Sequence, residues 1–86
     1  MSTAAGRKGE FHPAAEEYCE AIWELDEDEI DVIQARIAER LEVSRPAVSE
    51  MIRRLESDGL ITIGDRIELT GSGLALAEQV VRRHRL

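Results

Sequence analysis

Two carboxylates near the start of the chain and a histidine near its end are of types that can bind a cation. Glu17 and Glu20 are three residues apart, so on a helix both side chains reach the same side. His84 offers an imidazole nitrogen, a common ligand of transition metals. By spacing alone, however, these three residues fit a solvated acidic helix face and a surface histidine better than a metal site.

The same residues do not indicate catalysis. The sequence shows no nucleophile paired with the glutamates, no glycine-rich phosphate loop and no CxxC pair. Cys19 is the only cysteine, which excludes an internal disulfide and fits a reducing compartment. We interpret it as a small core residue, and His12, just before Pro13, as a cap or surface residue. The protein is therefore not expected to be an enzyme.

A second set of polar residues lies on one predicted helix after Ser44. Ser44 can cap its start, Pro46 fits its first turn, and Gly59 can end it. One side carries an apolar stripe at helical spacing, made of Val48, Met51, Ile52 and Leu55. The other side carries Arg45, Ser49, Glu50, Arg53 and Arg54. This polar side is either a solvated surface or a surface that reads DNA.

The remaining elements decide between these interpretations. Apolar periodicity predicts helices over about 13–26, 32–42, 45–58 and 71–86, and strands over about 60–63 and 66–69. Asp31 with Gln34 matches a capping box for the second helix, Thr70 caps the last one, and Gly64-Asp65 suits a two-residue hairpin turn. This order predicts a mainly α fold with a small β-hairpin, a winged helix-turn-helix. Residues 1–11 are expected to be a disordered lead, and 12–86 the domain.

The predicted core is aliphatic, because the chain has only one Phe, one Tyr and one Trp. The buried stripes are expected to be Ala14, Tyr18, Ile22 and Leu25; Ile33, Ile37, Ala38 and Leu41; Ile61, Ile63, Ile67 and Leu69; and Leu74, Ala77, Val80 and Val81. The four acids from Asp26 to Glu29 are expected to form a loop.

The net charge of −7 does not exclude nucleic acid as a partner. Residues 1–31 hold two basic and ten acidic groups, and residues 32–86 hold nine basic and eight acidic groups, so the halves carry −8 and +1. The acidity belongs to the first helix and the loop after it. No apolar run is long enough for a membrane span, and no secretion signal is seen, so we expect no membrane partner and a cytoplasmic location.

Four segments carry a specific resemblance, in order and spacing, over residues 12–86. They are Glu17–Leu25 (EYCEAIWEL), Ala35–Leu41 (ARIAERL), Val43–Ser49 (VSRPAVS) and Val81–Leu86 (VRRHRL). The chain resembles the N-terminal domain of the diphtheria-toxin-repressor family of metal-dependent transcriptional repressors, which includes iron- and manganese-dependent regulators. The resemblance implies a domain that binds duplex DNA.

The resemblance also implies which residues contact DNA. The positions that match the family's major-groove surface are Ser44, Arg45, Pro46, Ala47, Ser49 and Glu50, and Arg54 and Arg66 match phosphate-contacting positions. Glu50 stands where relatives can carry glutamine, and Gln34 where an arginine can hold the backbone. Since an acid can accept a hydrogen bond from cytosine but is repelled by phosphate, we expect an altered palindromic operator and modest affinity.

The metal ligands implied by the resemblance are Glu17, Glu20 and His84, and the cofactor is Mn²⁺ or Fe²⁺. Oxygen and nitrogen donors without a thioether favour manganese. Three ligands leave an octahedral site incomplete, so we expect this chain to bind metal weakly.

No stop signal follows the last helix, so the natural chain is expected to continue into a domain that completes the metal site and forms a homodimer. Two alternatives stay open: a metal-independent winged-helix regulator, and a winged helix that binds protein.

Overall fold

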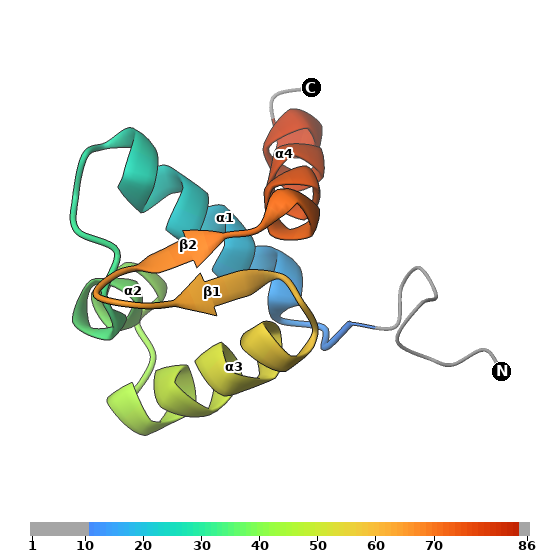
Figure 1. Ribbon diagram of the computed structural model, residues 1–86. Helices are drawn as coiled ribbons and strands as arrows, with labels where there is room; N and C mark the ends of the chain where they lie inside the picture. The colour runs from blue at the N-terminus through green and yellow to red at the C-terminus, as the bar shows by residue number, and fades with distance from the viewer. Residues whose placement is uncertain (1–10, 85–86) are drawn as a thin grey trace, which may run out of the picture.

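The computed structural model describes residues 11–84, and within them the elements follow the predicted order (Figure 1). The elements are α1 (Ala15–Glu27), α2 (Gln34–Leu41), α3 (Arg45–Ser57), β1 (Ile61–Ile63), β2 (Ile67–Leu69) and α4 (Gly71–His84). The mainly helical, winged helix-turn-helix prediction is confirmed. The predicted lead, apart from Phe11, and the last two residues of the predicted final helix lie outside the described range.

Helix α3 begins and ends as its sequence predicts. The Ser44 hydroxyl accepts a hydrogen bond from the N–H of Ala47 at 3.2 Å, and Pro46 occupies the first turn. Gly59 follows the helix with φ +77°, a left-handed conformation that glycine adopts at little cost. The buried stripe consists of Val48, Ile52 and Leu55, with Met51 half-buried. Burial of this stripe leaves the arginine-bearing side of α3 facing outward.

Helix α2 is shorter than predicted, and the proposed capping box is wrong. The N-cap is Ile33, in an extended conformation, and no side chain caps the helix. Asp31 instead forms an ion pair with Arg66 at 3.5 Å. The carbonyl of Val32 accepts a hydrogen bond from the N–H of Ile67 at 2.9 Å. This contact with β2 keeps the chain extended before α2, and Ile33, predicted to be buried, is 39% exposed.

The hairpin pairs Ile61 with Leu69 and Ile63 with Ile67, so its turn has three residues, Gly64–Arg66, rather than two. Arg66, predicted to start the second strand, belongs to this turn. Ile61 and Ile67 are buried, but Ile63 is 43% exposed. The prediction that all four apolar strand residues share the buried face fails at Ile63, next to the turn.

Helix α1 is central to the core and packs against α2, α4 and β2. It extends through Glu27, so the first two of the four acids predicted as a loop are helical. Its buried residues are Ala15, Tyr18, Cys19, Ala21, Ile22 and Leu25. Helix α4 buries Ala77 and Val80, whereas Leu74, predicted to be buried, is 40% exposed. No helix of the described residues is long and apolar enough to cross a membrane.

One hydroxyl closes the base of the hairpin. Thr70 Oγ1 donates a hydrogen bond to the carbonyl of Gly59 at 2.6 Å and accepts one from the N–H of Gly73 at 3.1 Å. The N–H of Thr70 also donates to the carbonyl of Leu60 at 3.0 Å. Helix α4 approaches this point so closely that a Cβ on Gly73 would lie 2.0 Å from the Leu60 oxygen.

The hairpin divides the molecule into two sides (Figure 1). Helix α3 packs against β1, whereas α1 and α4 pack against β2. The predicted major-groove residues and Arg54 therefore lie on the α3 side of the hairpin, Arg66 lies in its turn, and the residues predicted to bind metal lie on α1 and α4.

Candidate nucleic-acid interface and metal site

The exposed start of α3 carries most of the predicted DNA-binding residues. Four of them, Ser44, Arg45, Pro46 and Glu50, are exposed, and Ala47 and Ser49 are half-buried. The N–H of Ala47 already donates to the Ser44 hydroxyl, and Pro46 has no N–H. The first turn therefore has few backbone N–H groups free to bind a ligand. We call this surface, residues 44–50, the reading end.

The predicted phosphate contacts, Arg54 and Arg66, lie in the last turn of α3 and in the hairpin turn. Arg54 Nε is 3.5 Å from Asp58 Oδ2, and Arg66 Nη2 is 3.5 Å from Asp31 Oδ1. Both arginine side chains are more than half exposed. The pair of Arg66 with Asp31 is exposed on both sides and therefore weak, so Arg66 can exchange its carboxylate for a phosphate at small cost.

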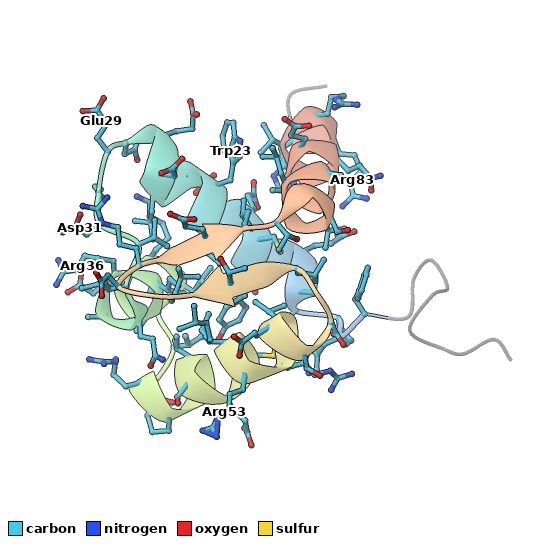
Figure 2. All side chains as sticks on the ribbon, viewed as in Figure 1. Trp23, Glu29, Asp31, Arg36, Arg53 and Arg83 are labelled. Carbon is cyan, nitrogen blue, oxygen red and sulfur yellow. The ribbon has the colours of Figure 1, made fainter. Side chains whose placement is uncertain are left out.

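Arg53 and His12 are not among the DNA-contacting positions that the resemblance implies, although both lie beside them. Arg53 projects from the outer side of α3 (Figure 2), with Nη2 3.5 Å from Ser49 Oγ. The sequence already placed Arg53 on the same polar side as Ser49, four residues earlier. His12 lines a groove of about 450 Å³ with Ala47, Glu50, Met51 and Arg54.

His12 does not cap α1, whose N-cap is Ala14 and which has no side-chain cap, and it lies half-buried beside α3. Its Nδ1 accepts a hydrogen bond from the N–H of Ala14 at 3.0 Å. The Nδ1 atom of His12 is therefore used within the chain, and Nε2 is the ring nitrogen that does not take part in this bond. No sequence pattern connects His12 with α3, because the contact depends on the packing of α1.

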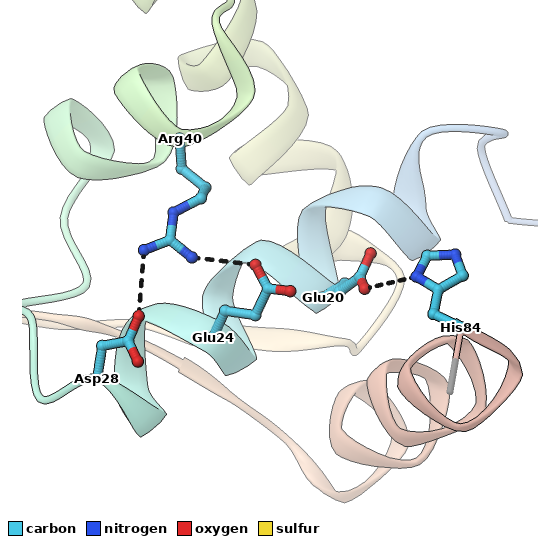
Figure 3. A network of polar contacts seen from close by, with 5 residues as sticks. All are labelled: Glu20, Glu24, Asp28, Arg40 and His84. Carbon is cyan, nitrogen blue, oxygen red and sulfur yellow. Dashed lines mark hydrogen bonds and ion pairs between the residues drawn. The ribbon is translucent and has the colours of Figure 1, made fainter. Parts of the chain in front are cut away.

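Two of the three predicted metal ligands meet where α1 and α4 cross. His84 Nδ1 lies 3.0 Å from Glu20 Oε2 (Figure 3), and Arg83 Nη2 lies 2.7 Å from Glu16 Oε1. The Glu20 side chain is 17% exposed and that of His84 is 64% exposed. We call these four residues the corner. It combines nitrogen and oxygen donors of the kind that Mn²⁺ and Fe²⁺ accept.

Glu17, the third predicted ligand, is exposed and is not gathered into the corner. Within residues 11–84, no group of three or more His, Cys, Asp or Glu side chains is positioned to hold a metal. The donor types therefore fit a metal, but residues 11–84 bring together only two of the predicted ligands, Glu20 and His84.

The acidic row on α1 continues from the corner toward α2 (Figure 3). Arg40 on α2 donates hydrogen bonds to Glu24 at 3.0 Å and to Asp28 at 3.3 Å. The hydrogen bond with Glu24 is the main cause of a raised Arg40 pKa. Glu20, Glu24 and Asp28, spaced four residues apart, thus bridge α1 to α4 at one end and to α2 at the other.

Cys19 takes no part in the corner, although it precedes Glu20. Its side chain is fully buried, and burial raises the pKa of the thiol to about 12. Burial also raises the pKa of Tyr18, with a smaller contribution from Glu17. Since the thiolate is the form that binds metals and attacks electrophiles, Cys19 is a core residue, as predicted.

The model of the family described as "Iron dependent repressor, N-terminal DNA binding domain" matches residues 10–66. The chain belongs to this family. The iron-dependent-repressor domains are DNA-binding domains rather than enzymes, as the sequence predicts.

Individual relatives support the same family assignment. The chain is 47% identical over 79 residues to the iron-dependent repressor IdeR of Mycobacterium tuberculosis (strain ATCC 25618 / H37Rv), an alignment that covers 90% of this chain and 34% of that protein. It is 51% identical over 73 residues to the diphtheria toxin repressor of Corynebacterium efficiens, covering 83% of this chain and 32% of that protein. The chain thus spans about a third of the length of these curated relatives.

Solved structures of metal regulators share the fold of this chain. The metal-dependent transcriptional regulator MtsR superposes with a TM-score of 0.77 at 37% identity, covering 85% of this chain and 35% of that one. The manganese regulator SloR superposes with a TM-score of 0.75 at 36% identity, covering 87% and 36%. This member of the iron-dependent-repressor family therefore shares its domain with regulators named for different metals.

Proposed function

We propose that this domain reads a palindromic operator by placing the start of α3 in the major groove, and that it does so as part of a metal-dependent repressor. The observation that carries the proposal is the outward-facing reading end on a helix whose opposite stripe is fully packed. A recognition helix of this kind contacts base edges with its first residues.

The reading end contains distinct chemistry for bases and for phosphates. Arg45 can donate two hydrogen bonds to a guanine, Glu50 can accept one from a cytosine amino group, and Ala47 can contact a thymine methyl. The arginines at positions 53, 54 and 66 supply charge for the backbone on either side. Chromosomal DNA as the ligand supports a cytoplasmic site of action.

The proposed metal is Mn²⁺ or Fe²⁺, with Glu17, Glu20 and His84 among its ligands. The 3.0 Å approach of His84 to Glu20 supports this assignment for two of them. A bound divalent metal would supply positive charge that holds these donors together. The remaining ligands, and the contacts of a homodimer, would come from outside this chain, since relatives are about three times as long.

A fluorescence titration with labelled duplex DNA at a stated salt concentration tests the reading end. We expect Arg45→Glu to weaken binding at least about tenfold, because it loses a base contact and repels phosphate. Arg82→Glu is the matched control, since it makes the same charge change on an exposed residue of α4. Equal losses in both variants would reduce the effect to overall charge and contradict the proposal.

Direct Mn²⁺ binding, measured by calorimetry on the longer protein, tests the metal assignment. Glu20→Ala and His84→Ala should each reduce the affinity by about tenfold or more. Mn²⁺-stimulated operator binding should fall in parallel. Unchanged stimulation in both variants would instead favour a metal-independent regulator.

A further inference from the structure

A groove on the side of the hairpin away from α3 is not used by the proposed function. It measures about 510 Å³ and lies among α1, β2 and α4. Its apolar lining consists of Ile22, Trp23, Ile67, Leu69 and Leu74. The Trp23 ring lies between α1 and α4 (Figure 2), and Leu74 is 40% exposed there.

Four carboxylates surround this apolar floor, those of Asp26, Glu27, Glu68 and Glu78. All four residues are exposed, and within residues 11–84 none of them forms an ion pair, although five other carboxylates on α1, α2 and the loop after α1 pair with arginines. The two helices repeat one arrangement, in which an apolar residue precedes a carboxylate by one turn: Trp23 and Glu27 on α1, Leu74 and Glu78 on α4. The groove therefore offers apolar contact and negative charge together.

This combination selects the chemistry of its occupant. Phosphates of DNA and anionic lipid headgroups are repelled by four carboxylates. An arginine side chain satisfies both features, because its stem packs on apolar surface while its guanidinium binds carboxylates and the face of an indole ring. Leucine side chains next to it would cover the rest of the floor.

We propose that this groove docks a protein segment in which arginine alternates with apolar side chains. The proposal goes beyond DNA reading and does not depend on it. Because α3 packs against β1 and the groove is built on β2, docking would leave the reading end open.

The chain carries its own reporter for this site, because Trp23 is its only tryptophan. The probe is the peptide acetyl-Ala-Arg-Leu-Arg-Leu-Ala-amide, which contains no aromatic residue. We expect it to change the tryptophan emission of the 86-residue chain saturably. The same peptide with Glu in place of Arg should not bind, and the peptide with Ala in place of Leu should bind at least about fivefold more weakly.

Two variants identify the groove as the site. Asp26→Lys with Glu78→Lys should weaken the arginine peptide at least about tenfold, because two attractions become repulsions. Glu39→Lys with Glu56→Lys makes the same charge change on exposed residues outside the groove and should leave the affinity within about twofold. Leu74→Gln tests the apolar floor without changing charge and should weaken binding about threefold or more. Circular dichroism confirms that each variant is folded.

Other outcomes would overturn the proposal. Equal affinity of the two lysine double variants would reduce binding to overall charge. Spermine binding as tightly as the peptide would make the groove a site for polycations rather than for a protein segment. Emission that depends on protein concentration, with self-association in sedimentation that Leu74→Gln abolishes, would make its occupant a second copy of the chain.

Discussion

The reading end and the corner use opposite means to place their side chains. At the reading end, a capped helix packed on Val48, Ile52 and Leu55 fixes the backbone, and the polar side chains need no partner to be in place. At the corner, two helices cross and are joined by an exposed ion pair between Glu16 and Arg83 and by the hydrogen-bond contact between Glu20 and His84. Apolar burial is worth more than exposed ion pairs. The surface proposed to read DNA is thus held in place within the domain, whereas the metal site proposed at the corner would need additional ligands.

The largest expected effect on stability comes from a substitution that displaces α4, the helix that carries two of the four corner residues. Gly73→Val should lower the free energy of unfolding by about 3 kcal/mol, because even a Cβ would meet the Leu60 oxygen at 2.0 Å. Urea denaturation measures this. Gly71→Ala, two residues earlier with nothing within 4 Å of its Cβ, should change stability by less than about 1 kcal/mol. Similar losses in both variants would show that the close approach does not fix α4.

A smaller effect is expected from the cap of the reading end. Ser44→Ala should cost about 1 kcal/mol of stability, since the N–H of Ala47 loses its acceptor. The amide of Ala47 should also exchange faster with deuterium. Ser57→Ala, at the other end of α3, should stay within about 0.5 kcal/mol. If the two serine variants were equivalent, the start of α3 would not be fixed by its cap.

The smallest effect is expected from an ion pair of the corner. Arg83→Gln should lower stability by less than about 0.5 kcal/mol at low salt and by even less at high salt, because the pair with Glu16 is exposed. Arg82→Gln, an exposed neighbour for which no ion pair is seen within residues 11–84, gives the baseline. Thermal denaturation at two salt concentrations measures the difference. A loss greater than that of Ser44→Ala would reverse the ranking of the two regions.

Local patterns predicted the elements that depend on local forces. The cap at Ser44, the stop at Gly59 and the cap at Thr70 each involve residues within one helical turn, and each is present in the structure. The predictions that failed involve contacts between residues that are far apart in the sequence. Asp31 looked like a cap for α2 because Gln34 follows it, but the pairing of Val32 with β2 keeps the chain extended there, and Asp31 contacts Arg66 instead.

The candidate site shows the same division. The reading end follows from the polar side of one helix. The approach of Glu20 to His84 joins residues 64 positions apart, so spacing alone favoured a solvated surface, and only the family resemblance connected them. His12 was missed for the same reason, because its position beside α3 depends on how two helices pack.

The hydrogen bonds of Thr70 close the hairpin at its base, so the rest of the hairpin is not needed to connect α3 with α4. Thr70 forms hydrogen bonds with Gly59 and Leu60 after α3 and with Gly73 in the first turn of α4. These bonds hold the two helices together directly, without contacts from the hairpin turn. If α3 reads DNA as proposed, extra residues inserted at Gly64–Arg66 would change how far the hairpin extends along a duplex without moving that helix. The length of DNA covered and the bases recognised could then change separately.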